Sequence, residues 1–361
     1  MKTDFLIIGA GPAGLSSAIT TGKYGVRTLI VDDGIKPGGQ LTKQTHKFLG
    51  SYKQYASIRG IEIARNFISQ IDELDNITLM PQTTLIGAYN LNKWVAVKED
   101  KTFVIEPEKV LVATGASERM IPFLNNDLPG VYGAGAVQTM MNLYGVIPGN
   151  RILMVGAGNI GLIVSYQLMQ AGCQIASVVE AASSIGGYWV HSAKILRMGI
   201  PILTNTTIVK ALGKKRVTGA IIADVDNSFK PVESSYREIE CDTICLAVGL
   251  IPLTDLLFQI GCQMKFIPEL CGDVPLRDDR LETSVKGVFV AGDVSGIEEA
   301  TSAILEGELA GLHIAKELGK KVENYESRIS DIHDSLEQLR SGETAVKIHR
   351  GLEKLKGINE S

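Results

Sequence analysis

Two glycine-rich motifs with the spacing GxGxxG are the residues of this chain most clearly suited to chemistry. The first occupies residues 9–14 (GAGPAG) after the apolar run 5–8, and the second occupies residues 156–161 (GAGNIG) after the apolar run 152–155. This spacing is typical of a strand that turns tightly into a helix, where N–H groups at the helix start bind a pyrophosphate. The chain is therefore predicted to bind two dinucleotides. The residues expected to bind them are Gly9, Gly11, Pro12, Ala13 and Gly14 in the first motif, and Gly156, Gly158, Asn159, Ile160 and Gly161 in the second.

An acidic residue follows each motif at the distance expected for a carboxylate that binds the adenosine ribose. Asp32 lies 18 residues after Gly14, and Glu180 lies 19 residues after Gly161. At the second site, a carboxylate favours a free ribose 2′-hydroxyl and repels a 2′-phosphate, so NAD(H) is expected rather than NADP(H). The alternative that these glycines serve only packing stays open for both motifs.

The elements that must position these residues are two strand–helix–strand units. A length of 361 residues, 45% of them hydrophobic, with 38 glycines, is typical of an α/β protein with two or more domains. The expected ranges are 4–9, 12–24 and 26–32 for the first unit, and 152–155, 159–171 and 174–179 for the second.

Charge and cysteine content indicate which partners and which cellular compartment to expect. The net charge of −4 is spread over interspersed acidic and basic residues, which gives no indication of a nucleic-acid or membrane-surface partner. The uncharged stretch 152–179 is long enough to span a membrane, but its glycines and amide side chains favour a buried strand, turn and helix. The chain begins without a basic leader and its five cysteines form no CxxC, so a cytoplasmic protein is expected.

Four further motifs follow in order: residues 38–41 (GGQL), 110–116 (VLVATGA), 246–249 (LAVG) and 287–293 (GVFVAGD). With the glycine motifs they resemble the thioredoxin-reductase-like branch of the flavoproteins with two dinucleotide-binding domains, from residue 4 to about residue 315. The resemblance implies an α/β fold of two Rossmann-like domains, the second inserted in the first. It places an FAD domain at 1–116 and 248–317, an NAD domain at 117–247 and a helical tail at 318–361.

The resemblance also implies roles for the added motifs. Residues 39–41 would pass the flavin ring, and Asp293 would bind the ribityl chain. The helix opening near Glu299 would direct its N-terminus at the flavin, where its dipole stabilises negative charge on the reduced ring. The cofactor-binding residues implied in these motifs are Gly39, Gln40, Leu41, Ala113, Thr114, Gly115, Gly249, Gly292, Asp293, Glu299, Ala300 and Thr301.

The chain departs from this branch at the redox-active cysteines. Thioredoxin reductases carry a CxxC where this sequence has residues 129–136 (PGVYGAGA), and glutathione reductases carry cysteines where it has residues 39–46 (GQLTKQTH). Without a thiolate beside the flavin, a thiol–disulfide relay has no route. The chain is therefore predicted not to be a disulfide reductase.

Residues 117–123 and 130–138 resemble a narrower group, the FAD/NAD-type subunits of multisubunit amino-acid dehydrogenases and oxidases. This group includes dye-linked L-proline dehydrogenase, hydrogen cyanide synthase, opine oxidase and sarcosine oxidase alpha. The resemblance implies an FAD-dependent NAD(H):acceptor oxidoreductase that exchanges hydride between nicotinamide and flavin. Its electrons would pass to a substrate-oxidising flavoprotein subunit or a small electron carrier, within a homo- or hetero-oligomer. Because no cysteine follows Cys271, an iron–sulfur segment like that of several members is not expected.

Two other functions stay open. One is a non-catalytic or electron-transfer flavin subunit whose second site holds another adenine nucleotide, such as ATP. The other is an enzyme like the ferredoxin–NADP reductases, which Glu180 argues against. No catalytic side chain is assigned, because the flavin performs the chemistry; His46 is either an acid or base near the ring or a surface histidine.

The cysteines outside the motifs have two possible interpretations, a metal site or buried core residues. Cys241 and Cys245 lie in an expected strand, 240–249, where they would share one face and could form a metal site with Cys262 and Cys271; buried core cysteines are the favoured alternative, and no metal is predicted.

The tail carries two narrow apolar stripes that could dock on the chain itself, pair in a dimer or bind another subunit. The stripes comprise Ile329, Ile332, Leu336 and Leu339, then Val346, Ile348, Leu352 and Leu355.

Overall fold

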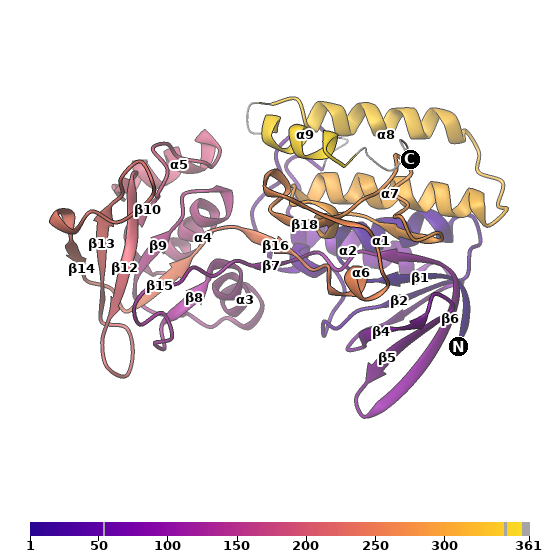
Figure 1. Cartoon of the computed structure of the whole chain (residues 1–361), viewed down its shortest axis with the longest axis horizontal. Helices are drawn as coiled ribbons and strands as arrows, with labels where there is room; N and C mark the ends of the chain where they lie inside the picture. Colours follow the sequence, from indigo (N-terminus) through magenta and orange to yellow (C-terminus); the bar gives the residue numbers. More distant parts are fainter. Residues whose placement is uncertain (53–54, 343–344, 356–361) are drawn as a thin grey trace. The chain divides into compact units, whose positions relative to one another are not determined.

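The chain is an α/β protein in which one compact unit is inserted into another (Figure 1). The computed structural model describes residues 1–52, 55–342 and 345–355. The first unit comprises the described residues of Met1–Ser117 and Ile251–Ser361, and the second is Glu118–Leu250. The two connections are β7 (Ala116–Glu118) and β16 (Leu250–Pro252), which pair with each other. The predicted fold class, an α/β protein with an inserted second unit, is confirmed.

The first unit is built on a sheet in the order β3-β2-β1-β6-β5-β4, with β19 also pairing with β6. The strands β1, β2, β3, β6 and β19 are parallel, and β4 and β5 extend the sheet in antiparallel fashion. Ile8 lies opposite Val31 and Val112, so three parallel strands end side by side. The strand bounds are β1 (Lys2–Ile8), β2 (Thr28–Val31), β3 (Ile77–Met80), β4 (Thr84–Asn90), β5 (Lys93–Lys98), β6 (Lys101–Val112) and β19 (Val288–Val290).

The second unit repeats this arrangement on a parallel sheet in the order β11-β10-β9-β15-β8. Val155 lies opposite Val179 and Leu246, so these strands also end together. A separate antiparallel sheet has the order β12-β13-β14. The strand bounds are β8 (Val131–Gly133), β9 (Arg151–Val155), β10 (Gln174–Val179), β11 (Ile202–Leu203), β12 (Thr206–Leu212), β13 (Gly219–Asp224), β14 (Arg237–Ile239) and β15 (Thr243–Leu246).

Helices pack on the sheets. The two helices predicted from the glycine motifs are present, with bounds close to those expected. α1 (Pro12–Gly22) and α4 (Asn159–Gln170) begin at the residues expected and end one or two residues earlier. The uncharged stretch 152–179 is β9, α4 and β10, and among the described residues no helix is both long and apolar enough to cross a membrane. The remaining elements are α2 (Gly60–Asp72), α3 (Ala134–Tyr144), α5 (Trp189–Arg197), α6 (Asp255–Gln259), α7 (Ala300–Glu317), β17 (Met264–Ile267), β18 (Gly272–Pro275), and 3-10 turns at Gly39–Lys43, Glu233–Ser235, Pro268–Leu270 and Asp293–Ser295.

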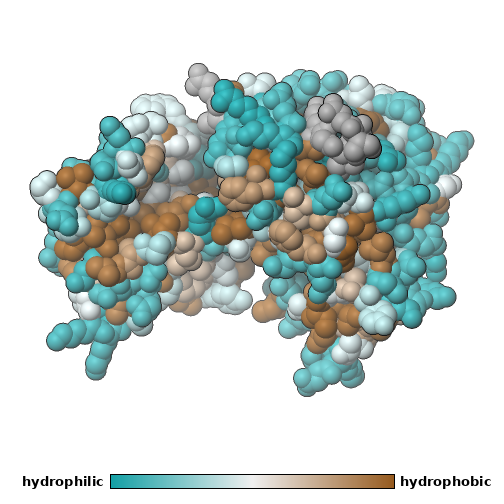
Figure 2. All heavy atoms as spheres, in the orientation of Figure 1, coloured by the Kyte–Doolittle hydropathy of each residue, from teal (hydrophilic) through white to brown (hydrophobic). Residues whose placement is uncertain are grey.

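The described part of the tail packs on the first unit. Ile332 and Leu336 of α8 (Tyr325–Leu339) are buried in the core that also contains α1 and α7. Leu355, just beyond α9 (Val346–Glu353), is buried against Leu270 and its neighbours. In Figure 1, α8 lies along α7, and in Figure 2 the visible face of α8 is mostly hydrophilic. Of the alternatives left open by the sequence, the structure thus has six of the eight stripe residues packed on their own chain, whereas Val346 is exposed and Leu339 belongs to neither cluster.

The expected shared face of Cys241 and Cys245 is wrong. β15 begins at Thr243, after Cys241, so the alternation of a strand does not extend to that residue. Cys241 packs in the cluster with Leu153 and Val155, whereas Cys245 packs with Ile152 and Met154. Burial raises the pKa of the Cys241 thiol to about 12, as expected of a core thiol.

Candidate dinucleotide-binding sites

The first glycine turn, residues 9–14, follows β1 and begins α1. Gly9 has φ +105°, and a Cβ there would lie 2.3 Å from the carbonyl oxygen of Ala113. A Cβ at Gly14 would lie 1.9 Å from the oxygen of Gly9. By contrast, a Cβ at Gly11 would meet no atom within 4 Å. Packing thus requires Gly9 and Gly14, while Gly11 leaves open space before the N-terminus of α1 that suits a pyrophosphate.

The second glycine turn, residues 156–161, has the same geometry between β9 and α4. Gly156 has φ +106°, and its Cβ would lie 2.2 Å from the oxygen of Ala247. A Cβ at Gly161 would lie 2.1 Å from the oxygen of Gly156, and one at Gly158 would meet no atom within 4 Å. Asn159 and Ile160 form the first turn of α4. The same three glycine functions therefore occur twice in the chain.

In each unit a carboxylate closes the glycine turn by accepting a hydrogen bond from the backbone of that turn. The two oxygens of Asp32 accept hydrogen bonds from the N–H of Ala10 at 2.6 Å and of Gly34 at 2.9 Å. Those of Glu180 accept from Ala157 at 2.8 Å and from Ala182 at 2.9 Å. Because each carboxylate oxygen has a second lone pair, both side chains keep capacity for ribose hydroxyls. Burial raises the pKa of Asp32, although its two N–H partners oppose this.

A returning loop contacts each turn. The N–H of Gly38 donates to Ala10 at 2.8 Å, and a Cβ at Gly39 would lie 2.8 Å from Cα of Gly11. In the second unit the N–H of Gly187 donates to Ala157 at 2.9 Å. Gln40 is exposed and Leu41 is buried. Sequence reasoning missed Gly187, although the Gly-Gly pair 186–187 follows Glu180 much as the pair 38–39 follows Asp32.

The segments 113–115 and 247–249 form a third matching pair. The N–H of Ala113 donates to Ile8 at 2.8 Å, and that of Ala247 donates to Val155 at 2.7 Å. Two residues later, Gly115 and Gly249 both have positive φ, +73° and +114°. The Thr114 hydroxyl donates to the carbonyl of Leu253 at 2.8 Å, and the carbonyl of Gly249 accepts from Arg119 at 2.9 Å. Each segment therefore contacts the first glycine of its turn and changes direction two residues later, at a glycine with positive φ.

The segment 292–298, called here the flavin loop because of its predicted role, lies against α1 and leads into α7. A Cβ at Gly292 would lie 3.2 Å from Cβ of Ala13. Asp293 is partly buried, and this loss of solvation raises its pKa to about 7. Glu299 is the N-cap of α7, and Ala300 and Thr301 form its first turn. The structure thus brings the first glycine turn, residues 38–41, residues 113–115 and the flavin loop together in the first unit.

A buried ionic cluster that the sequence did not reveal lies beside the flavin loop. Glu306 of α7 accepts hydrogen bonds from Arg277 at 2.8 Å, from Arg340 at 2.9 Å and from the N–H of Gly292 at 2.9 Å. Burial alone would raise the pKa of Glu306, but the two guanidinium groups hold it below its usual value. No pattern in the sequence links these residues, which lie on separate elements.

In the second unit a carboxylate contacts the segment where thioredoxin reductases have their cysteines. Glu118 accepts hydrogen bonds from the N–H groups of Gly135 and Ala136 and so caps α3. His46, in the segment where the glutathione-reductase branch has its cysteines, is half-buried and stacks on Phe48 with ring centroids 6.0 Å apart. Among the described residues no group of three or more His, Cys, Asp or Glu side chains could hold a metal ion.

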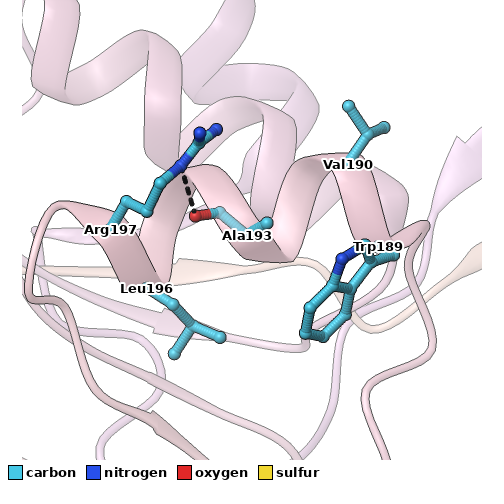
Figure 3. A pocket seen from close by; sticks show the side chains of 5 residues that line it. All are labelled: Trp189, Val190, Ala193, Leu196 and Arg197. Atoms are coloured by element: carbon cyan, nitrogen blue, oxygen red, sulfur yellow. Dashed lines mark hydrogen bonds between the residues drawn. The ribbon is translucent and has the colours of Figure 1, made fainter.

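The second unit also has a hydrophobic hollow of about 510 Å³ along α5 (Figure 3). Trp189 and Leu196 project to the same side of the helix, and Arg197 donates to the carbonyl of Ala193 at 3.2 Å. Its lining is almost wholly apolar, unlike that of the glycine turns. The hollow therefore differs in chemistry from a dinucleotide site.

Comparison with known protein families shows to which family this chain belongs. A model of the pyridine nucleotide-disulphide oxidoreductases matches residues 3–307. The chain belongs to this family. Members bind FAD, usually together with a pyridine nucleotide. The open space at Gly11 and Gly158 and the closing carboxylates fit such dinucleotides. The family assignment predicted from the sequence is thereby confirmed.

Curated relatives in the family are named as subunits of larger enzymes. The chain is 28% identical to the A subunit of opine oxidase from Agrobacterium tumefaciens, over 86% of this chain and 64% of that protein. It is 28% identical to the alpha subunit of sarcosine oxidase from Rhizobium meliloti, over 88% of this chain and 31% of that protein. It is 25% identical to the HcnB subunit of hydrogen cyanide synthase from Pseudomonas aeruginosa, over 93% and 77%. The chain thus spans less than two thirds of the length of the first two.

Two solved structures share the fold of this chain. L-proline dehydrogenase from P. horikoshii has a TM-score of 0.71 at 21% identity, over 94% of this chain and 59% of that one. Thioredoxin reductase from T. acidophilum has a TM-score of 0.73 at 22% identity, over 88% and 99%. These likenesses support the two Rossmann-like domains predicted from the sequence.

Proposed function

We propose that this chain is an FAD-dependent NAD(H):acceptor oxidoreductase that passes electrons to an acceptor other than a disulfide. The observation that carries the proposal is the duplicated geometry of the two glycine turns in a member of this family. Each has an open position at its middle glycine and a carboxylate that closes it. One chain therefore offers two sites suited to two dinucleotides.

In this proposal the first unit holds FAD. The first glycine turn and Asp32 would bind its diphosphate and ribose, and Gly39 with its neighbours would lie along the ring. Asp293 would bind the ribityl chain, and the start of α7 would stabilise negative charge on the ring. When bound, FAD supplies hydride and electron transfer, and the surrounding residues supply position and electrostatics.

The second unit would hold NAD(H), with its diphosphate at Gly158 and its adenosine ribose on Glu180. Both oxygens of Glu180 already accept backbone N–H bonds, so the carboxylate is held in one orientation. A 2′-phosphate placed there would face a negative charge, which favours NADH over NADPH.

The acceptor is proposed to be a substrate-oxidising subunit or a small electron carrier. No CxxC occurs in the sequence, and the segment where thioredoxin reductases carry a redox-active pair is instead bound by the carboxylate of Glu118. The relatives from opine oxidase and hydrogen cyanide synthase are named as subunits, which supports a similar setting here.

An anaerobic titration of the purified, yellow protein tests the proposal. Additions of NADH should bleach the visible flavin band in a 1:1 ratio, and NADPH should do so only at much higher concentration. A Gly158→Ala variant, which leaves the first unit unchanged, should keep the flavin but need at least about tenfold more NADH for the same bleaching. A protein that binds no flavin, or flavin that NADH leaves oxidised, would refute the proposal. Turnover of a disulfide substrate would refute the assigned acceptor class.

A further inference from the structure

The ionic cluster beside the flavin loop includes one residue from outside the family's shared region. Arg340 is the C-cap of α8 in the tail, and the match to the family model ends at residue 307. Its Nη2 donates to Glu306 at 2.9 Å, and Glu306 in turn accepts the N–H of Gly292 at 2.9 Å. The tail is therefore joined to the first residue of the flavin loop through a single carboxylate.

Arg340 also reaches the other end of the loop. Its Nε and Nη2 donate to the two oxygens of Glu298 at 3.0 and 2.7 Å, a bidentate pair. The N–H of Glu298 points at the carboxylate of Asp293 at 3.4 Å. Arg340 thus contacts Glu298 at one end of the flavin loop and Glu306, which accepts the N–H of Gly292 at the other end. The segment between these ends contains the predicted ribityl-binding residue.

The charged side chains of this cluster are largely buried, so each needs a partner of opposite charge. The side chains of Glu306 and Glu298 are 4% and 8% exposed, and that of Arg340 is 14% exposed. Arg277 is the second cation in contact with Glu306. Loss of Arg340 would leave Glu306 with Arg277 and would remove the guanidinium that pairs with Glu298. An uncompensated buried carboxylate is strongly unfavourable.

We propose that Arg340 is a positioning residue of the flavin site, which holds residues 292–298 in place and neutralises the carboxylates around them. The tail thereby completes a cofactor site whose other parts belong to the family fold. This inference rests on the proposed binding of FAD to the first unit.

The test compares Arg340→Gln with the wild-type full chain. The variant should bind FAD at least about tenfold more weakly. At alkaline pH, where the released carboxylates are ionised, its flavin midpoint potential should fall by about 30 mV, equal to a tenfold change in the ratio of its affinities for oxidised and reduced flavin. Arg340→Lys should recover part of both effects, because it restores the charge but not the bidentate pair.

Arg328→Gln is the matched control. Arg328 also joins α8 to α7, through Glu308 at 2.6 Å, and its other hydrogen bond goes to Tyr24 rather than to the flavin loop. Its loss removes an ion pair between α8 and α7 without a change at the flavin loop, so the flavin potential should stay unchanged. Circular dichroism and thermal unfolding of the flavin-free variants check that each is folded.

The outcomes separate this inference from the proposed function. Wild-type protein that binds no FAD would refute both. Wild-type protein that binds FAD, with Arg340→Gln equal to Arg328→Gln in affinity and in potential, would refute the positioning role alone. If Arg340→Gln fails to fold, Arg340→Lys decides: wild-type affinity and potential in that folded variant would contradict a role for the bidentate contact.

Discussion

The carboxylate of Glu180 accepts the backbone N–H of Ala157 at 2.8 Å, inside the second glycine turn. Asp32 makes the corresponding bond to Ala10 at 2.6 Å in the first turn. Each acid is thus part of the turn itself as well as a candidate ribose ligand. A change at either acid should affect both the turn and the bound nucleotide.

Glu180→Ala should weaken NADH binding by about tenfold, because charge-assisted bonds to the ribose are lost. The preference for NADH over NADPH should shrink in the same variant, since the negative charge that faces a 2′-phosphate is gone. Calorimetry with both coenzymes measures the two effects. Glu233→Ala, at an exposed residue of the same unit, is the control and should bind as wild type. Unchanged NADH affinity in Glu180→Ala would contradict the assigned NAD preference.

Two glycines of the second turn should respond in opposite ways to the same substitution. Gly158→Ala places a methyl group in open space, so the melting temperature should change little while NADH affinity falls at least about tenfold. Gly161→Ala places it 2.1 Å from the oxygen of Gly156, so the unfolding free energy should fall by about 1–3 kcal/mol. Thermal unfolding and coenzyme titration of both variants check this pair. Equal behaviour of the two would argue against a phosphate site at Gly158.

The pH dependence of stability should contain a contribution from His313 of α7. Burial lowers its pKa to about 4, below the ordinary value of 6.5. Below that ordinary value the unfolded chain takes up a proton that the folded chain resists, so stability is lost as the pH falls from 6.5 toward 4. Denaturant unfolding at neutral and acidic pH should show a smaller loss in His313→Gln than in wild type. His349→Gln, at an exposed position, is the control. Parallel wild-type and His313→Gln profiles would contradict the assignment.

Leu336→Ala tests whether the tail belongs to the core of the first unit. Leu336 is 4% exposed in the cluster shared with α1 and α7, so truncation should lower the unfolding free energy by about 2–4 kcal/mol. Val346→Ala, at a residue that is 44% exposed, should change it by less than about 0.5 kcal/mol. Denaturant unfolding at low protein concentration measures both. A Leu336→Ala protein as stable as wild type would contradict the burial of this stripe in the first unit.

Much of the candidate site could be predicted because its requirements are local. A positive φ at Gly9 and a close approach at Gly14 are needed within one turn, so they leave a pattern of fixed spacing. Asp32 follows at a distance set by one helix and one strand. The loop glycine Gly187 obeys the same logic, and the pair 186–187 signals it once the two units are compared residue by residue.

The faces of irregular segments could not be predicted in this way. The alternation of a strand predicts Cys241 and Cys245 on one face, but the strand begins after Cys241. The cap that Glu118 makes on α3 likewise depends on where the chain returns after a long loop. Neither relation has a period or spacing that the sequence displays.

By itself, the sequence determined the fold class, the two glycine turns with their acids, and the positions of the main strands and helices, because each depends on residues close together along the chain. Only the tertiary structure decided that the tail docks on the first unit and that Arg340 meets Glu298 and Glu306. Those contacts join elements far apart in sequence, and they form because burial of charged groups requires partners from whichever elements pack together.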